Sequence, residues 1–466
     1  EWYVDNDGIN IRADRPDGTS VTQPGGGGMW GDGTAAFNYL GTDTSKYSQY
    51  YDLKSSGVPS PWQKLISASE ILNNTPLESR EAVFAQYFDI DKILWHLACE
   101  NIFVDDDSYI FKGKMDYYLY FDITTNLWSS YDYDGNSAIS NTRASQWGPF
   151  YNSEKINYPL LNKILAVPAY RQRYLAYYRT LVKDVLNQNN WQNIIDTYDT
   201  LIKEIVVQEK KKGITYNQYL NEINAIKNYA TLRRNYLNNN IELNTIGPNQ
   251  SDLMYLVNDK EFGKVLPTNN VIITVKATFA EGIHKVNIHY SLGLDNRFET
   301  ASMYDDGTNG DLTANDGVFS VSLPKQKATT LIRFYTEAVG NNSVRTRSFL
   351  PEGTAHETMF YVVEGQQNLE KTVVINEFMA SNNGIIKDPF GENEDWIELY
   401  NLTDKDIDMS GYHLSDNPTN ITKFKFKSGT IIKANDYLIV WADENGSQGS
   451  MHANFKLSVN GETIIL

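Results

Sequence analysis

The residues best suited to chemistry are the carboxylates between positions 104 and 136. An acidic run, Asp105-Asp106-Asp107, stands near the start of this stretch, and Asp132 and Asp134 stand two residues apart near its end. Carboxylates hold Mg²⁺ in phosphate-handling sites, where water and phosphate fill the other positions. Phosphoryl-transfer enzymes combine such a carboxylate with another that orients a hydroxyl. The segment therefore predicts a metal–phosphate site, although a capped, solvated acidic loop explains the same residues.

Two local elements must position these carboxylates. Asp89 is a predicted N-cap for a helix whose apolar residues recur three and four apart through Ala98, and the acidic run follows that helix. A hairpin is predicted from the strand at 117–120, a turn, and a second strand from Leu127. Residues two apart on a strand share a face, so Asp132 and Asp134 would point the same way if the second strand extends that far.

Composition changes twice along the chain, which predicts three domains. Residues 1–245 combine mixed elements with a helical tail from about 158: helices are expected at 160–186, broken near Pro168, at 191–207 and at 216–237. Residues 246–366 and 370–466 alternate with period two between turn residues, which is typical of antiparallel sandwiches. The predicted fold class is multidomain α+β: an α/β module with a helical tail, then two immunoglobulin-like β-sandwiches.

The overall composition excludes several classes of protein. The chain has 466 residues and a net charge of 41 − 58 = −17, so a nucleic-acid partner bound through a broad basic face is not expected. Its apolar runs fall far short of the ~20 residues of a membrane span. Cys99 is the single cysteine, which excludes an intrachain disulfide. The six histidines are scattered, with no pair at metal-ligand spacing on a predicted helix.

A Gly-punctuated loop at 304–319 is a second candidate metal site. Carboxylate and amide oxygens of this kind hold Ca²⁺, but the loop lacks the order and terminal Glu of an EF-hand. An Asx-turn network, in which the side chains bind loop amides, is the favoured alternative. The side chains that would supply the oxygens are Asp305, Asp306, Asn309, Asp311 and Asp316.

The first carboxylate-rich segment resembles the CotH family of spore-coat-type proteins, which are atypical secreted kinases with a kinase-like fold. The resemblance covers roughly residues 1–240 and places the start of the chain inside the smaller lobe of that fold. It is carried by Asp107-Ser108-Tyr109, Lys112-Gly113-Lys114, Tyr117-Tyr118-Leu119-Tyr120 and Tyr131-Asp132-Tyr133-Asp134-Gly135-Asn136.

This resemblance implies a role for individual residues. Asp107 would orient the acceptor hydroxyl, and Asp132 would hold Mg²⁺ or Mn²⁺ with Asp134 beside it. Asp116 stands where members often have Asn and would also ligate the metal. Tyr131 replaces a Trp that lies against the adenine of ATP in many members. The residues implied in phosphate contact are Lys112, Lys114 and, on a strand that resembles one late in the smaller lobe, Arg12.

The last segment resembles a lamin-tail domain, an immunoglobulin-like sandwich. The matching runs are Val374-Ile375-Asn376-Glu377-Phe378, Glu394-Asp395-Trp396-Ile397-Glu398-Leu399-Tyr400-Asn401 and Met409-Ser410-Gly411-Tyr412-His413-Leu414. Such domains imply adhesion or spacing on exported proteins. The loop at 304–319 resembles one in immunoglobulin-like domains that accompany CotH modules.

Three functions follow from these resemblances and from composition. The first is Mg²⁺/ATP-dependent phosphorylation of Ser or Thr hydroxyls on a coat or surface protein. The second is a non-catalytic surface-assembly scaffold with a degenerate kinase-like module. A carbohydrate-associated module is the third, suggested only by the Tyr and Trp content. In the first two functions the protein is expected to be exported to the extracellular space or cell surface.

Overall fold

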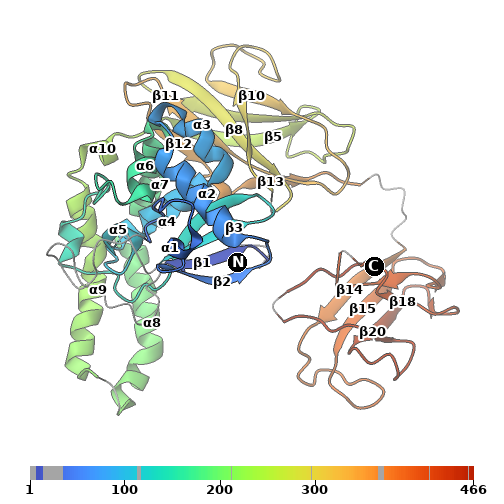
Figure 1. Cartoon of the computed structure of the whole chain (residues 1–466). Coiled ribbons are helices and arrows are strands. Elements are labelled where there is room, and N and C mark those ends of the chain that lie inside the picture. The colour runs from blue at the N-terminus through green and yellow to red at the C-terminus, as the bar shows by residue number, and fades with distance from the viewer. Residues whose placement is uncertain are drawn as a thin grey trace. The chain divides into compact units, whose positions relative to one another are not determined.

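The computed structural model describes residues 7–13, 35–112, 117–210, 213–294, 296–365, 372–418, 420–459 and 461–466. The chain divides into two compact units, residues 1–365 and residues 366–466 (Figure 1). The predicted boundary near residue 245 therefore lies inside the first unit. Lys114 and Asp116 fall outside the described residues, as does the side chain of Lys112.

The first sheet of the larger unit is built around the predicted hairpin. Its antiparallel strands run in the order β2 (Tyr51–Ser56), β1 (Ile9–Ala13), β3 (Tyr117–Asp122) and β4 (Leu127–Asp132). Tyr117 pairs with Asp132, so the hairpin is confirmed. The strand does not extend to Asp134, because that carboxylate accepts the backbone N–H and side-chain amide of Asn136 in a turn. The condition for strand alternation to align Asp132 with Asp134, a strand that extends to Asp134, is therefore not met.

Helices pack around this sheet. Asp89 caps α4 by accepting the N–H of Lys92, as its sequence position predicts. The helical tail breaks at Pro168, which lacks a backbone N–H and begins α7. Figure 1 shows α8 and α9 as a long helical pair. The helices are α1 (Thr44–Tyr47), α2 (Pro61–Asn74), α3 (Leu77–Tyr87), α4 (Ile90–Ile102), α5 (Tyr109–Lys112), α6 (Pro159–Leu165), α7 (Pro168–Asp184), α8 (Gln188–Gln208), α9 (Tyr216–Leu237) and α10 (Ile241–Asn244).

A β-sandwich completes the larger unit. One sheet has the order β10-β7-β5-β6, and the other has the order β12-β11-β8-β9 with β13 also paired to β11. Ile273, Ile288 and Phe334 come from both sheets and share one buried core. The strands are β5 (Asn249–Val257), β6 (Lys260–Glu261), β7 (Val271–Thr278), β8 (Ile283–Leu292), β9 (Glu299–Met303), β10 (Val318–Leu323), β11 (Leu331–Gly340), β12 (Arg347–Leu350) and β13 (Met359–Val362).

The sandwich packs directly on α4 and α7. Trp95 of α4 stacks on Tyr177 of α7 with ring centroids 4.5 Å apart, and its indole N–H donates to Thr354 Oγ1 at 3.1 Å. Tyr335 and Phe349 of the sandwich belong to the same apolar core as these helices. The sandwich thus helps to fix the helix that carries the site described below.

The smaller unit is all β. Its main sheet has the order β14-β15-β20-β21, in which β20 and β21 are parallel. Ile397, Met409, Phe426 and Val440 lie in its core. The strands are β14 (Val373–Met379), β15 (Asp395–Asn401), β16 (Ile407–Asp408), β17 (His413–Leu414), β18 (Phe424–Lys425), β19 (Ile431–Ile432), β20 (Tyr437–Ala442) and β21 (His452–Ala453). The predicted multidomain α+β class is confirmed. In the described part of the chain, no helix has the length and apolarity required to cross a membrane.

Candidate functional site

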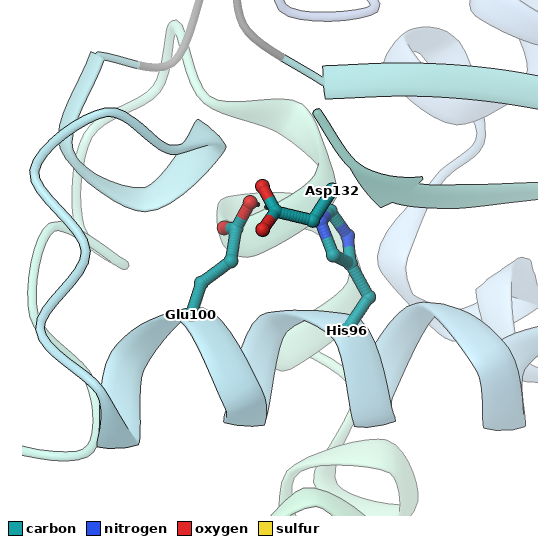
Figure 2. A group of neighbouring side chains, drawn as sticks. All are labelled: His96, Glu100 and Asp132. Carbon is teal, nitrogen blue, oxygen red and sulfur yellow. Dashed lines mark ion pairs between the residues drawn. The ribbon is translucent and has the colours of Figure 1, made fainter. Parts of the chain in front are cut away.

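Helix α4 and strand β4 bring three ionisable side chains together. His96 and Glu100 lie one turn apart on the same face of α4, and Asp132 is the last residue of β4. One ligand atom from each lies within 4.8 Å of the other two. Figure 2 shows the Asp132 carboxylate reaching over the helix toward Glu100. Two carboxylates and an imidazole therefore converge where the hairpin meets the helix.

His96 is held in place from two sides. Its Nδ1 lies 2.8 Å from the Oγ of Ser130, which shares a face of β4 with Asp132. Its Nε2 lies 2.8 Å from Oε1 of Glu100, a close ionic contact that lacks hydrogen-bond angles. Burial opposes protonation, but the charge of Glu100 outweighs it and raises the pKa of His96. The Glu100 carboxylate thus favours the protonated form of His96.

Glu100 also organises the acidic loop. Its two carboxylate oxygens accept the backbone N–H groups of Tyr109 and Ile110, each at 3.2 Å. The loop between α4 and α5 is thereby folded back over the helix. The predicted catalytic residue, Asp107, lies in this loop and donates its N–H to Oδ1 of Asp105 at 2.9 Å.

The carboxylates of the cluster repel one another. Burial raises the pKa of Asp105, which is 3% exposed, to about 7, and the charges of Asp132 and Glu100 add to that rise. Burial and the Glu100 charge also raise the pKa of Asp132. Asp106, by contrast, forms an ion pair with Arg143. The site therefore brings several carboxylates together, and the charges of neighbouring carboxylates add to the raised pKa values of Asp105 and Asp132.

Two of the predicted nucleotide contacts, Tyr131 and Arg12, lie on the other face of the same sheet. Tyr131 points away from Asp132, stacks on Tyr118 with centroids 4.8 Å apart, and donates its hydroxyl proton to Oδ1 of Asn10 at 3.0 Å. The guanidinium of Arg12 lies 3.8 Å from the ring centroid of Tyr133. This half-buried aromatic face meets the acidic cluster at the end of β4.

The sequence identified only part of this site. Asp132 lies within the cluster, whereas the Asp134 carboxylate accepts hydrogen bonds from Asn136 and does not belong to it. His96, Glu100 and Asp105 were missed. The spacing of His96 and Glu100, four residues apart on a predicted helix, was an available signal, but a search for paired histidines overlooks a His–Glu pair.

The loop at 304–319 brings three of its five predicted residues together. Asp305, Asp311 and Asp316 each offer a ligand atom within 4.8 Å of the others. Their oxygens also accept loop N–H groups, including those of Gly307 and Gly317, which is the bonding expected of an Asx-turn network. The Asp306 carboxylate accepts the backbone N–H of Thr308, and the side-chain amide of Asn309 donates a hydrogen bond to the Thr308 hydroxyl. Calcium binding here stays a prediction.

A cavity of about 770 Å³ opens elsewhere, between α4, α7 and the strands β8 and β11. Four of its charged residues are paired with one another: Arg173 lies 3.0 Å from Asp91 and 3.5 Å from Glu337, and Arg347 also binds Glu337.

Comparison with known families matches residues 6–237 to a family described as CotH kinase protein, and residues 366–466 to Lamin Tail Domain. A search of curated proteins finds no match. The first match spans α4, the acidic loop and the β3–β4 hairpin, and the second spans the all-β unit. The chain therefore combines a module of the CotH family, at residues 6–237, with a lamin tail domain at residues 366–466.

Proposed function

We propose that this protein transfers the γ-phosphate of ATP to Ser or Thr hydroxyls of a coat or surface protein, with Mg²⁺ or Mn²⁺ as the metal. The observation that carries the proposal is the convergence of Glu100, His96 and Asp132 at the end of β4. This cluster lies beside the loop in which the family resemblance places the catalytic aspartate. We also propose that the protein works outside the cell or on its surface.

The donor set fits a divalent cation. Asp132 and Glu100 would hold it through carboxylate oxygens, which Mg²⁺ and Mn²⁺ prefer. The raised pKa values of Asp105 and Asp132 support this fit, because a bound cation neutralises the charges that repel one another. The cation would supply electrostatic stabilisation of the phosphate oxygens.

The aromatic face beside the cluster suits the rest of a nucleotide. Tyr118, Tyr131 and Tyr133 form a stacked group that is partly open to solvent, and adenine binds well against aromatic faces. Arg12 lies over Tyr133, one residue beyond Asp132, and its guanidinium would bind a phosphate between base and metal. Tyr131, being engaged with Asn10, would support this surface from within it.

Asp107 would orient the acceptor hydroxyl. Its backbone is fixed by Asp105, and the loop is fixed in turn by the carboxylate of Glu100. A carboxylate held in this way can accept a hydrogen bond from the hydroxyl without reorganising during transfer.

Transfer of labelled γ-phosphate from ATP to a Ser/Thr-rich protein substrate tests the proposal. We expect Asp107→Asn to reduce transfer at least 100-fold while retaining ATP binding, and Asp132→Asn to weaken metal–ATP binding as well. The exposed residue Asp252→Asn is the matched control. Equal transfer by all four proteins, or no nucleotide binding by the wild type, would refute the kinase function.

One observation favours the alternative, a surface-assembly scaffold. Helix α8 carries a stripe of apolar residues that are each more than half exposed, at helical spacing: Ile194, Tyr198, Leu201 and Ile205. Exposed stripes of this kind are typical of protein–protein contacts. Sedimentation compares the wild type with the double variant Leu201→Asp/Ile205→Asp, which should assemble less if α8 forms the contact. Sedimentation of Asp132→Asn shows whether assembly is independent of the acidic cluster.

A further inference from the structure

Three buried, metal-ligating side chains converge in the lamin tail domain, in a place where the sequence predicts no site. Asp388 lies in the segment between β14 and β15, Asp443 directly follows β20, and His452 begins β21. Their exposed fractions are 5%, 6% and 4%, and one ligand atom from each lies within 4.8 Å of the other two. Residues up to 64 positions apart in the chain thus meet inside one small domain.

The strand pairing fixes two of the three. Trp441 pairs with His452 and Ala442 with Ala453 in the parallel β20–β21 ladder, which brings Asp443 next to His452. His452 Nδ1 contacts Oδ2 of Asp443, and Oδ1 of Asp443 accepts the N–H of Asn445 at 2.8 Å. This contact places a ring nitrogen of His452 and a carboxylate oxygen of Asp443 within reach of one ion.

Asp388 provides an independent observation that points to a ligand. Its Oδ1 accepts the N–H groups of Phe390 at 3.0 Å and Glu392 at 2.7 Å. Its Oδ2 is buried and has no hydrogen-bond partner among the described residues. A buried carboxylate oxygen without a partner loses its hydration and gains nothing in return.

The charges of the group are also unbalanced. Among the ion pairs of the described residues, none joins a Lys or Arg to Asp388 or Asp443. The group brings two carboxyl groups together in a buried position, and buried charges require a partner. A divalent cation would offset the charges of both carboxylates and provide a partner for the buried Oδ2 of Asp388.

We propose that Asp388, Asp443 and His452 bind a divalent transition-metal ion, Zn²⁺ or Mn²⁺, that ties the 380–394 segment to the β20–β21 pair. Mixed imidazole and carboxylate donors suit these ions, whereas Ca²⁺ prefers oxygen ligands alone. Three protein ligands leave at least one coordination position for water. The site belongs to the lamin tail domain and does not depend on the proposed kinase activity.

Hydrogen exchange of the full chain, stripped with chelator and then supplied with Zn²⁺ or Mn²⁺, tests this site peptide by peptide. We expect one of the two ions to slow exchange at least 10-fold in peptides covering 380–394 and 441–453. Unchanged exchange in both regions with both ions would overturn the proposal. Because the readout is local, metal bound at the acidic cluster or in the 304–319 loop does not affect the result.

Variants then identify the ligands. Asp388→Asn and His452→Gln should each abolish the metal-dependent protection of 380–394 and lower the bound metal by one ion per chain. Asp404→Asn, which removes an exposed carboxylate from the same domain, should behave as wild type, and so should Asp132→Asn at this segment. Metal-dependent protection that survives in Asp388→Asn would overturn the assignment of Asp388 as a ligand. If that variant misfolds, the exchange of the wild type with and without metal decides whether the site exists.

Discussion

The hydroxyl of Tyr335, on strand β11 of the sandwich, donates a 2.8 Å hydrogen bond to Oδ2 of Asp91, on helix α4. Asp91 also binds Arg173 at 3.0 Å and accepts the hydroxyl proton of Tyr177, so all its bonds are made in a buried position. The same helix carries His96 five residues and Glu100 nine residues after Asp91. The sandwich is therefore a structural support for the helix of the acidic cluster.

Removing this bond should destabilise the larger unit. We expect Tyr335→Phe to lower the free energy of unfolding by about 1.5–3 kcal/mol, because a buried charged acceptor loses its donor. Urea denaturation of the full chain measures the change. Tyr304→Phe, at a half-exposed tyrosine, should lower the free energy of unfolding by less than about 0.5 kcal/mol. Equal losses in the two variants would contradict a supporting role for the Tyr335–Asp91 bond.

The same interface should weaken in acid. Burial alone would raise the pKa of Glu337, but Arg347 and Arg173 hold it well below its usual range, and Arg173 with Tyr177 likewise lowers the pKa of Asp91. A depressed carboxyl pKa stabilises the fold above the unfolded value of about 4, and that contribution disappears as pH falls through the folded value.

We therefore expect the stability gap between wild type and Glu337→Gln to be largest at pH 7 and to narrow steadily below pH 4. Denaturant unfolding at pH 7, 5, 4 and 3 provides the measurement. Glu281→Gln, at an exposed position, should track the wild type throughout. A gap that does not change with pH would show that Glu337 contributes only through packing.

Arg233 should be intolerant of even a conservative change. It is completely buried, and its guanidinium donates to the carbonyl oxygens of Asn101, Ile102, Ala144 and Trp147 and to the Tyr178 hydroxyl. Lysine keeps the charge but cannot reach acceptors in so many directions. Arg233→Lys should lower the free energy of unfolding by about 3 kcal/mol or more, since several buried carbonyls lose their donor. Arg345→Lys, at an exposed position, should change the free energy of unfolding little. An equally small change in Arg233→Lys would show that the buried hydrogen bonds of Arg233 do not stabilise the fold.

The acidic cluster should bind metal through Glu100. We expect Glu100→Gln to weaken Mn²⁺ affinity about 10-fold, because the variant loses one charge while its amide oxygen can still accept a loop N–H. Calorimetric titration in the Asp388→Asn background isolates this site from the lamin tail domain. Glu78→Gln, on the exposed start of α3, should leave the affinity unchanged. Identical affinities in the two variants would remove Glu100 from the ligand set.

The sequence by itself determined the local elements: the capped helix after Asp89, the break at Pro168, the β3–β4 hairpin and the alternating strands of both β regions. Each of these depends on interactions between near neighbours, so periodicity and capping residues reveal it. Only the tertiary structure decided that Asp132 meets His96 and Glu100, that the sandwich supports α4, and that Asp388 meets Asp443 and His452. These groupings depend on how distant elements pack, and the spacing of residues along a chain does not encode that packing directly.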